Sequence, residues 1–186
     1  MITHRDEKVL DFISQFHCAR SQTISKLFYD NKLRVARNRL TILYNHQVVQ
    51  REKLLYNKEY VYFMKKTSQL RHFLILSDFY ASLKEIGEIH NFAIEPTNID
   101  NIRPDAIIIF TIKETNKKQI SFLEIEISNN STNRHIGKYE RLKNSGDYKR
   151  FFTVFPSVIF ITDKKIPESS LDVKIIKTDL SNIKIL

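Results

Sequence analysis

Three carboxylates stand at positions where neighbouring strands would bring them together. Asp105 precedes the apolar run 106–110, and Glu124 and Glu126 lie within the apolar segment 119–127. Successive side chains of a strand alternate between its faces, so Glu124 and Glu126 share one face, roughly 7 Å apart. If Asp105 enters the adjacent strand, the three carboxylates converge. Oxygen atoms arranged in this way bind a hard cation such as Mg²⁺, which assists phosphodiester cleavage.

The Arg-Pro-Asp sequence that ends at Asp105 and the Glu-Ile-Glu triplet at 124–126 resemble the core of PD-(D/E)xK nucleases. An active enzyme of that kind has a lysine where this chain has Glu126, so we expect the nuclease chemistry to be absent. Lys138, in a helix expected at 133–145, is the candidate for a displaced lysine. We expect Mg²⁺ as a cofactor, held by Asp105 and Glu124, only if the remnant is active. This remnant comprises Asp105, Glu124, Glu126 and Lys138.

A simpler interpretation gives the same carboxylates a structural role. In it, Glu124 and Glu126 are polar residues of a half-buried strand and pair with basic side chains: Arg103, Arg134, Lys138 or Arg141. The geometry of the site, rather than the fold alone, decides between the two interpretations.

The amino-acid composition limits the classes of protein to which the chain could belong. With 186 residues, of which 42% are apolar and 27% charged, the chain has the composition of a globular protein with one large or two small domains. The single cysteine excludes an internal disulfide bond and a thiolate metal cluster. Three glycines are too few for a phosphate-binding glycine loop. The start of the chain lacks a signal-peptide core and no apolar run could span a membrane, so we expect a cytoplasmic protein.

Positive charge is concentrated in the first third of the chain. Residues 1–66 contain 13 Lys and Arg against 6 Asp and Glu, a net charge of +7. Residues 67–186 contain 17 against 15, a net charge of +2, and the two values sum to the overall +9. This distribution is typical of a nucleic-acid-binding module joined to a second domain, although it would also attract an acidic protein. We therefore predict a DNA-binding domain at 1–66 and a second domain at 67–186.

The first domain has the element order of a winged helix-turn-helix. Apolar spacing and turn residues predict a helix at 3–16, a short helix from Ser21, a helix at about 32–46, and strands at 48–55 and 59–63. Thr3 and Asp6 are placed to form a capping box at the first helix, and Ser21 is expected to cap the second.

The third helix of a helix-turn-helix enters the major groove of duplex DNA. Its inward stripe is expected to centre on Ala36, Leu40, Leu43 and Gln47, which leaves the opposite face exposed. The predicted DNA contacts lie on that face, at the start of the second helix and on the wing: Ser21, Gln22, Lys32, Arg34, Arg37, Asn38, Thr41, Asn45, Lys53 and Lys58. Arg and Asn suit base edges, and Lys and Arg also bind phosphates. The alternative is an ordinary charged helix face.

The second domain is expected to have a restriction-endonuclease-like mixed sheet, so the fold class as a whole is α+β. Helices are predicted at 68–86 and 133–145, and strands at about 91–96, 105–112, 119–127, 157–162 and 173–177. Because the second helix crosses between the strands at 119–127 and 157–162, these two strands are expected to be parallel. The strand at 173–177 is expected at a sheet edge, where it would pair with a partner or a second copy, or else inside the sheet.

Taken together, the chain resembles the replication-relaxation family of plasmids and other mobile elements. The resemblance rests on the winged-helix order, on Asp105, on the Glu124–Glu126 triplet, usually Glu-x-Asp in that family, and on the sequence around Lys138. It implies a DNA-binding accessory protein that assists a relaxase or a replication initiator at its origin, with double-stranded DNA and that protein as partners. A homodimer is an open possibility. The alternatives are a metal-dependent endonuclease with a displaced lysine and a winged-helix transcriptional regulator.

Overall fold

The computed structural model describes residues 2–54, 59–127 and 132–186, and the chain divides into two compact units, Met1–Ala81 and Ser82–Leu186. The long helix α4 (Leu70–Ile86) runs across this division, so most of its length belongs to the first unit. The expected junction after residue 66 assigns all of α4 to the second domain. None of the described helices is long and apolar enough to cross a membrane.

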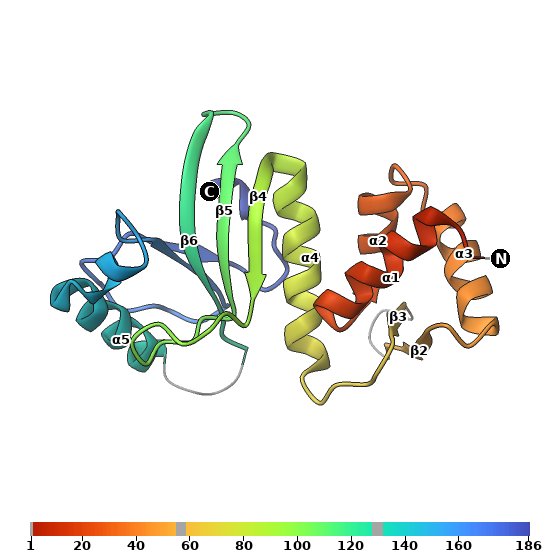
Figure 1. The fold of residues 1–186 in the computed structure, drawn as a ribbon, viewed down its shortest axis with the longest axis horizontal. Coiled ribbons are helices and arrows are strands. Elements are labelled where there is room, and N and C mark those ends of the chain that lie inside the picture. Colours follow the sequence, from red (N-terminus) through yellow and green to blue (C-terminus); the bar gives the residue numbers. More distant parts are fainter. Residues whose placement is uncertain (1, 55–58, 128–131) are drawn as a thin grey trace. The chain divides into compact units, whose positions relative to one another are not determined.

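Short helices and a small antiparallel sheet make up the first unit, together with most of α4 (Figure 1). The elements are α1 (His4–Phe16), β1 (Ala19–Arg20), α2 (Ser21–Phe28), α3 (Leu33–Asn45), β2 (Gln50–Lys53) and β3 (Tyr60–Phe63). The sheet has the order β1-β3-β2. The three helices and the two later strands were predicted from the sequence. β1 was not, because two residues are too few to carry an alternating pattern.

The local sequence explains where α1 begins, but not where α2 does. Thr3 accepts a hydrogen bond from the Asp6 amide and Asp6 bonds back to the Thr3 amide, which confirms the capping box. The prediction that Ser21 caps α2 is wrong. Arg20 holds the N-cap position and makes no side-chain capping hydrogen bond, and Ser21 is the first helical residue, buried beneath the surface.

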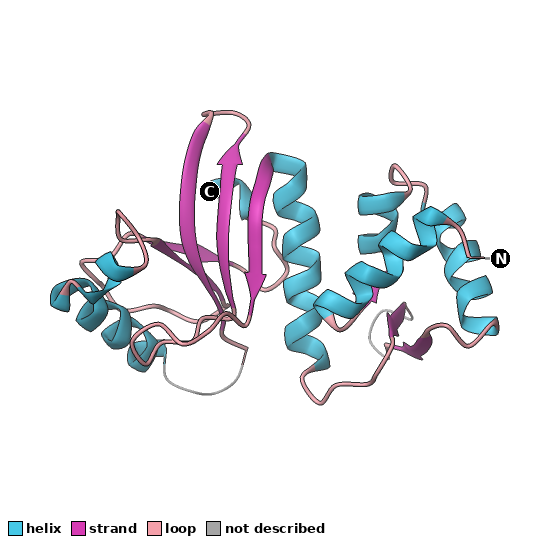
Figure 2. Ribbon diagram, viewed as in Figure 1, coloured by secondary structure: helices cyan, strands magenta, loops and turns pink. Residues whose placement is uncertain are grey.

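A five-stranded mixed sheet forms the second unit, with helices beside it (Figure 2). Its strands, in spatial order, are β4 (Gly87–Ile94), β5 (Ala106–Ile112), β6 (Lys117–Ile125), β7 (Ser157–Ile161) and β8 (Val173–Ile176). β4, β5 and β6 pair antiparallel, whereas β6–β7 and β7–β8 are parallel. The helix α5 (Thr132–Ser145) makes the crossover between β6 and β7, as predicted. The α+β class is therefore confirmed.

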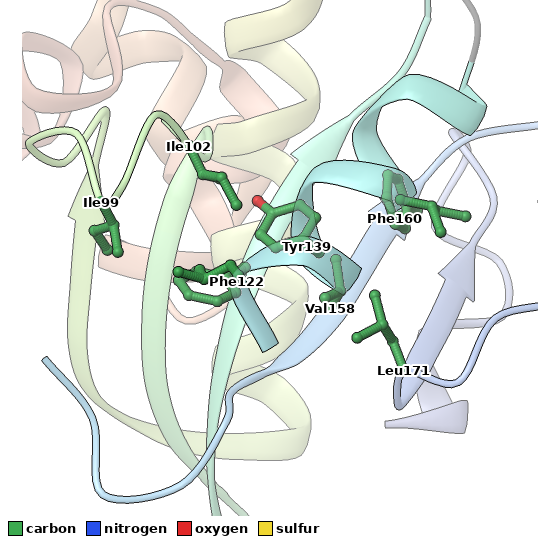
Figure 3. Close-up of a cluster of buried hydrophobic side chains, with 9 residues drawn as sticks. Ile99, Ile102, Phe122, Tyr139, Val158, Phe160 and Leu171 are labelled. Atoms are coloured by element: carbon green, nitrogen blue, oxygen red, sulfur yellow. The ribbon is translucent and has the colours of Figure 1, made fainter. Parts of the chain in front are cut away.

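A buried cluster holds α5 against the sheet (Figure 3). Ile136, Tyr139 and Leu142 recur at spacings of three along α5, and all three are nearly inaccessible to solvent. Tyr139 packs against Phe122 of β6, with ring centroids 5.1 Å apart. Because this packing fixes the rotation of α5, it also decides which polar side chains of the helix reach the end of β6.

The strand near the chain end lies at the sheet edge, as one of the two expectations had it. β8 pairs only with β7 among the described residues. The closing segment Ile183–Ile185 forms a short 3-10 helix. Just before it, the Asn182 side chain donates to the Ile175 carbonyl at 2.9 Å and accepts from the Lys177 amide at 2.8 Å. Asn182 therefore occupies part of the outer edge of β8, where a partner strand would bind.

Candidate functional site

The helix α3 presents a polar face to solvent. Arg34, Arg37, Asn38 and Asn45 are exposed, and Thr41 is half-buried, with its hydroxyl donating to the Arg37 carbonyl at 2.9 Å. The opposite side of the helix is buried through Ala36, Leu40 and Leu43. The predicted division of α3 into two faces is therefore confirmed, except that Gln47 lies beyond the helix and is exposed rather than inward.

The positive charge on this face is not neutralised within the described residues. α3 contains three arginines and no acidic residue. Lys32, Arg34 and Arg37 are exposed, and no described carboxylate forms an ion pair with them. An exposed cationic surface without internal partners is suited to an anionic ligand.

The third arginine of α3 serves the fold instead. Arg39 donates from Nε to Asp6 Oδ1 at 2.7 Å, and a second nitrogen binds the other carboxylate oxygen. The Asp6 side chain is fully buried, and the Arg39 guanidinium holds its pKa well below the usual range. The pair is a charged link between α1 and α3, so it fixes how α3 presents its outer face.

A second arginine joins the end of α3 to the small sheet. The Arg51 guanidinium of β2 lies 4.1 Å from the ring centroid of Tyr44 and 4.4 Å from that of Tyr60. Cation–π contact on both sides restrains this side chain and connects α3, β2 and β3. Arg51 was not predicted from the sequence, because its two aromatic partners come from different elements. Its neighbours in the chain, Glu52 and Lys53, are charged and do not indicate contact with aromatic rings.

The remaining predicted DNA contacts differ in their exposure. Gln22 and Lys53 are exposed, in α2 and β2 respectively. Ser21 is only 2% exposed and is not part of the outer surface, which corrects its assignment as a DNA contact. Lys58 lies outside the described residues.

The predicted carboxylates do come together where β5 begins and β6 ends. Ala106 pairs with Leu123 across the two strands, so Asp105 lies beside the Glu124 segment. Asp105 Oδ2 accepts a hydrogen bond from the Ile125 amide at 2.6 Å. Glu126 follows β6 directly, and its amide donates to the Ile161 carbonyl at 3.0 Å. Glu124 and Glu126 are 5% and 7% exposed, so both carboxylates need compensating partners.

Those partners are residues of α5 that the sequence analysis missed. The Tyr139 hydroxyl donates to Glu124 Oε1 at 2.6 Å. His135 Nδ1 lies 3.4 Å from Glu124 Oε2, and His135 Nε2 lies 3.3 Å from Glu126 Oε1. The imidazole therefore bridges the two carboxylates. The other oxygen, Glu126 Oε2, is buried and has no hydrogen-bond partner in the described part of the chain.

The basic residues expected to pair with the glutamates lie elsewhere. Arg103 is largely exposed and pairs with Glu95 at 3.7 Å, and Arg141 is exposed on α5. Lys138 is half-exposed, and within the described residues no ion pair joins it to either glutamate. The side chain of Arg134 lies outside the described part. Arg103, Lys138 and Arg141 therefore do not make the predicted pairs, and His135 contacts both glutamates instead.

The electrostatics of the cluster favour an internal positive charge. The hydrogen bond to Glu124 raises the pKa of His135, against the opposing effect of burial. Burial, with the negative charge of Glu124, raises the pKa of Asp105 to about 7. Burial also keeps the pKa of Tyr139 well above its usual value, so its hydroxyl stays a donor. An imidazolium between Glu124 and Glu126 offsets one of their two negative charges.

Mg²⁺, which the nuclease resemblance implies, does not fit this set of donors. Both oxygens of Glu124 already contact α5 and would have to leave these partners to bind the ion. Within the described residues, no group of three or more His, Cys, Asp or Glu side chains is arranged to hold a metal ion. The geometry is that of a polar cluster in which His135 and Tyr139 join α5 to the carboxylates at the end of β6.

Comparison with protein-family models, with curated proteins and with solved structures yields no match for this chain.

Proposed function

We propose that this chain is a double-stranded-DNA-binding protein whose first unit is a winged helix with α3 as its recognition helix. The observation that carries the proposal is the exposed face of α3, where arginine and asparagine side chains stand without described acidic partners. An α-helix fits the major groove, arginine suits guanine and phosphate, and asparagine suits adenine.

The element order supports the same proposal. Three helices followed by the β2–β3 hairpin make the arrangement in which the hairpin acts as a wing beside the recognition helix. Arg51, held between Tyr44 and Tyr60, ties this hairpin to the end of α3. The exposed Lys53 of β2 is then placed as a phosphate contact.

We further propose that the second unit is a restriction-endonuclease-like domain that serves as a scaffold. A mixed sheet with α5 crossing between the parallel strands β6 and β7 supports that fold, as does Asp105 beside Glu124. We do not propose nuclease activity, because His135 and Tyr139 occupy the carboxylates. The resemblance to replication-relaxation proteins makes an accessory role in plasmid replication or mobilisation the preferred biological setting over transcriptional regulation.

The test is duplex binding by the full chain, measured by fluorescence anisotropy over a range of salt concentrations. Affinity should fall steeply with salt, because neutralised phosphates release counterions. Arg37→Ala should weaken binding to all sequences and reduce the salt slope by about 1. Arg141→Ala, at an arginine of α5 that is also exposed, is the matched control and should change neither quantity.

Two results would count against the proposal. One is duplex affinity that is unchanged when Arg34 and Arg37 are both replaced by alanine. The other is equal binding by residues 82–186, provided that this fragment folds by circular dichroism. Purification of the native protein from its host, followed by sequencing of the co-purified DNA, separates an accessory role at one origin from regulation of promoters.

A further inference from the structure

Two apolar side chains lie on the outer surface of α3. Val35 is 48% exposed and Ile42 is 42% exposed. They are seven residues apart, which is close to two helical turns, so they lie on one side of the helix. Asn38 is three residues from Val35 and four from Ile42, and it stands next to both on the same surface.

Packing within the unit does not account for these two side chains. The buried stripe of α3 is already formed by Ala36, Leu40 and Leu43. On a helical projection, Val35 and Ile42 flank the polar face on the side opposite Arg37, with Arg34 and Asn38 between. The outer face therefore offers apolar contact, an amide and guanidinium groups side by side.

We propose that α3 recognises thymine, with Val35 and Ile42 contacting the C5-methyl groups of thymines beside an adenine bound by Asn38. The inference rests on the proposed function and names the base that α3 selects. In the major groove, the thymine methyl is the apolar group on the base edges, and the adenine edge matches the asparagine amide. Arg34 and Arg37, which lie on the side of Asn38 away from the apolar pair, would meet phosphates there.

Charge favours DNA over a second copy of the chain as the occupant of this face. A symmetric contact through Val35 and Ile42 would bring the Arg34 side chains of both copies close together. No acidic residue of α3 is available to offset that repulsion. DNA carries negative phosphates, which suit the arginines, and thymine methyl groups, which suit Val35 and Ile42.

The experiment begins with duplexes selected from a random pool by the full chain. In the best duplex, each thymine is replaced in turn by deoxyuridine, which removes only the methyl group, and binding is measured by anisotropy. At one or two positions the affinity should fall roughly fourfold for each methyl that is buried. In Val35→Ala or Ile42→Ala, the same replacement should have no further effect. Both residues are exposed, so alanine should leave the helix folded.

Val154→Ala, an exposed valine of the second unit, is the matched control and should keep the full difference between thymine and deoxyuridine. Equal affinity for thymine and deoxyuridine at every position, in a protein that binds DNA, would overturn the thymine inference alone. A dimer in sedimentation that dissociates in Ile42→Ala would also overturn it, because the face would then be a protein interface. Failure to bind any duplex would remove the proposed function as well.

Discussion

Arg39 of α3 binds the fully buried carboxylate of Asp6 in α1, so one arginine of the basic helix stabilises the fold while its neighbours remain exposed. The two residues are 33 positions apart in the chain. Asp6 also closes the capping box with Thr3, so its carboxylate serves both the start of α1 and the position of α3. The direction in which α3 faces therefore depends on this pair.

The first prediction concerns the stability that this pair provides. Asp6→Ala should lower the free energy of unfolding of the first unit by about 2 kcal/mol, because the charge-assisted bonds from Arg39 and the capping box are lost. Asp11→Ala, an exposed carboxylate of the same helix, is the control and should change it by about 0.5 kcal/mol or less. Urea unfolding monitored by circular dichroism measures both. Equal effects of the two substitutions would show that the Asp6–Arg39 pair contributes little.

The second prediction is a dependence of stability on pH in the second unit. Asp105 has a raised pKa of about 7 in the folded protein, against about 4 when unfolded. Between these values the folded state keeps a proton that the unfolded state releases, so stability should fall as pH rises from about 4 to 7. The raised pKa of His135 acts in the same direction above its unfolded value of about 6.5.

Thermal unfolding of the full chain at several pH values tests this direction. Asp105→Asn should flatten the decline between pH 4 and 7, whereas Asp172→Asn, an exposed carboxylate before β8, should leave it intact. His135→Gln should remove the part of the decline that lies above pH 6.5. A melting temperature that rises steadily from pH 4 to 7 in both the native chain and Asp172→Asn would contradict the prediction.

Periodicity and turn residues were sufficient to predict most of this fold. The capping box at Thr3, the two-faced α3 and the parallel pairing of β6 with β7 all follow from local pattern and connection length. β4 begins earlier than predicted, at Gly87 directly after α4. There a side-chain carbon would lie 2.8 Å from the Thr111 carbonyl oxygen, so the close approach needs glycine.

Sequence patterns could not predict which side chains bind the buried carboxylates. His135 and Tyr139 meet Glu124 because Phe122, Ile136 and their neighbours set the rotation of α5 on the sheet. From charge alone, arginine and lysine side chains were predicted as the partners of Glu124 and Glu126. A histidine four residues before a tyrosine on the same helix is a usable signal, since such a pair lies on one face, but it does not identify which strand that face will meet.

The third prediction is that the chain does not cleave DNA. Plasmid incubated with Mg²⁺ or Mn²⁺ should stay supercoiled, because Glu124 is held by Tyr139 and His135, and Glu126 stands in place of a lysine. Gel electrophoresis of the plasmid over a time course provides the measurement. Nicking by the native chain that disappears in Glu124→Ala, while Glu140→Ala on α5 remains active, would establish a nuclease site.

The last prediction concerns the outer edge of β8, where the Asn182 amide bonds to the Ile175 carbonyl and the Lys177 amide. These are the bonds that a residue of a neighbouring strand would make, so Asn182 blocks strand addition at this end of the sheet. Asn182→Ala should free both backbone groups and produce concentration-dependent association in sedimentation velocity. Asn144→Ala, an exposed asparagine of α5, is the control and should sediment like the native chain. If Asn182→Ala also sediments like the native chain up to high concentration, the edge is protected by something other than this amide.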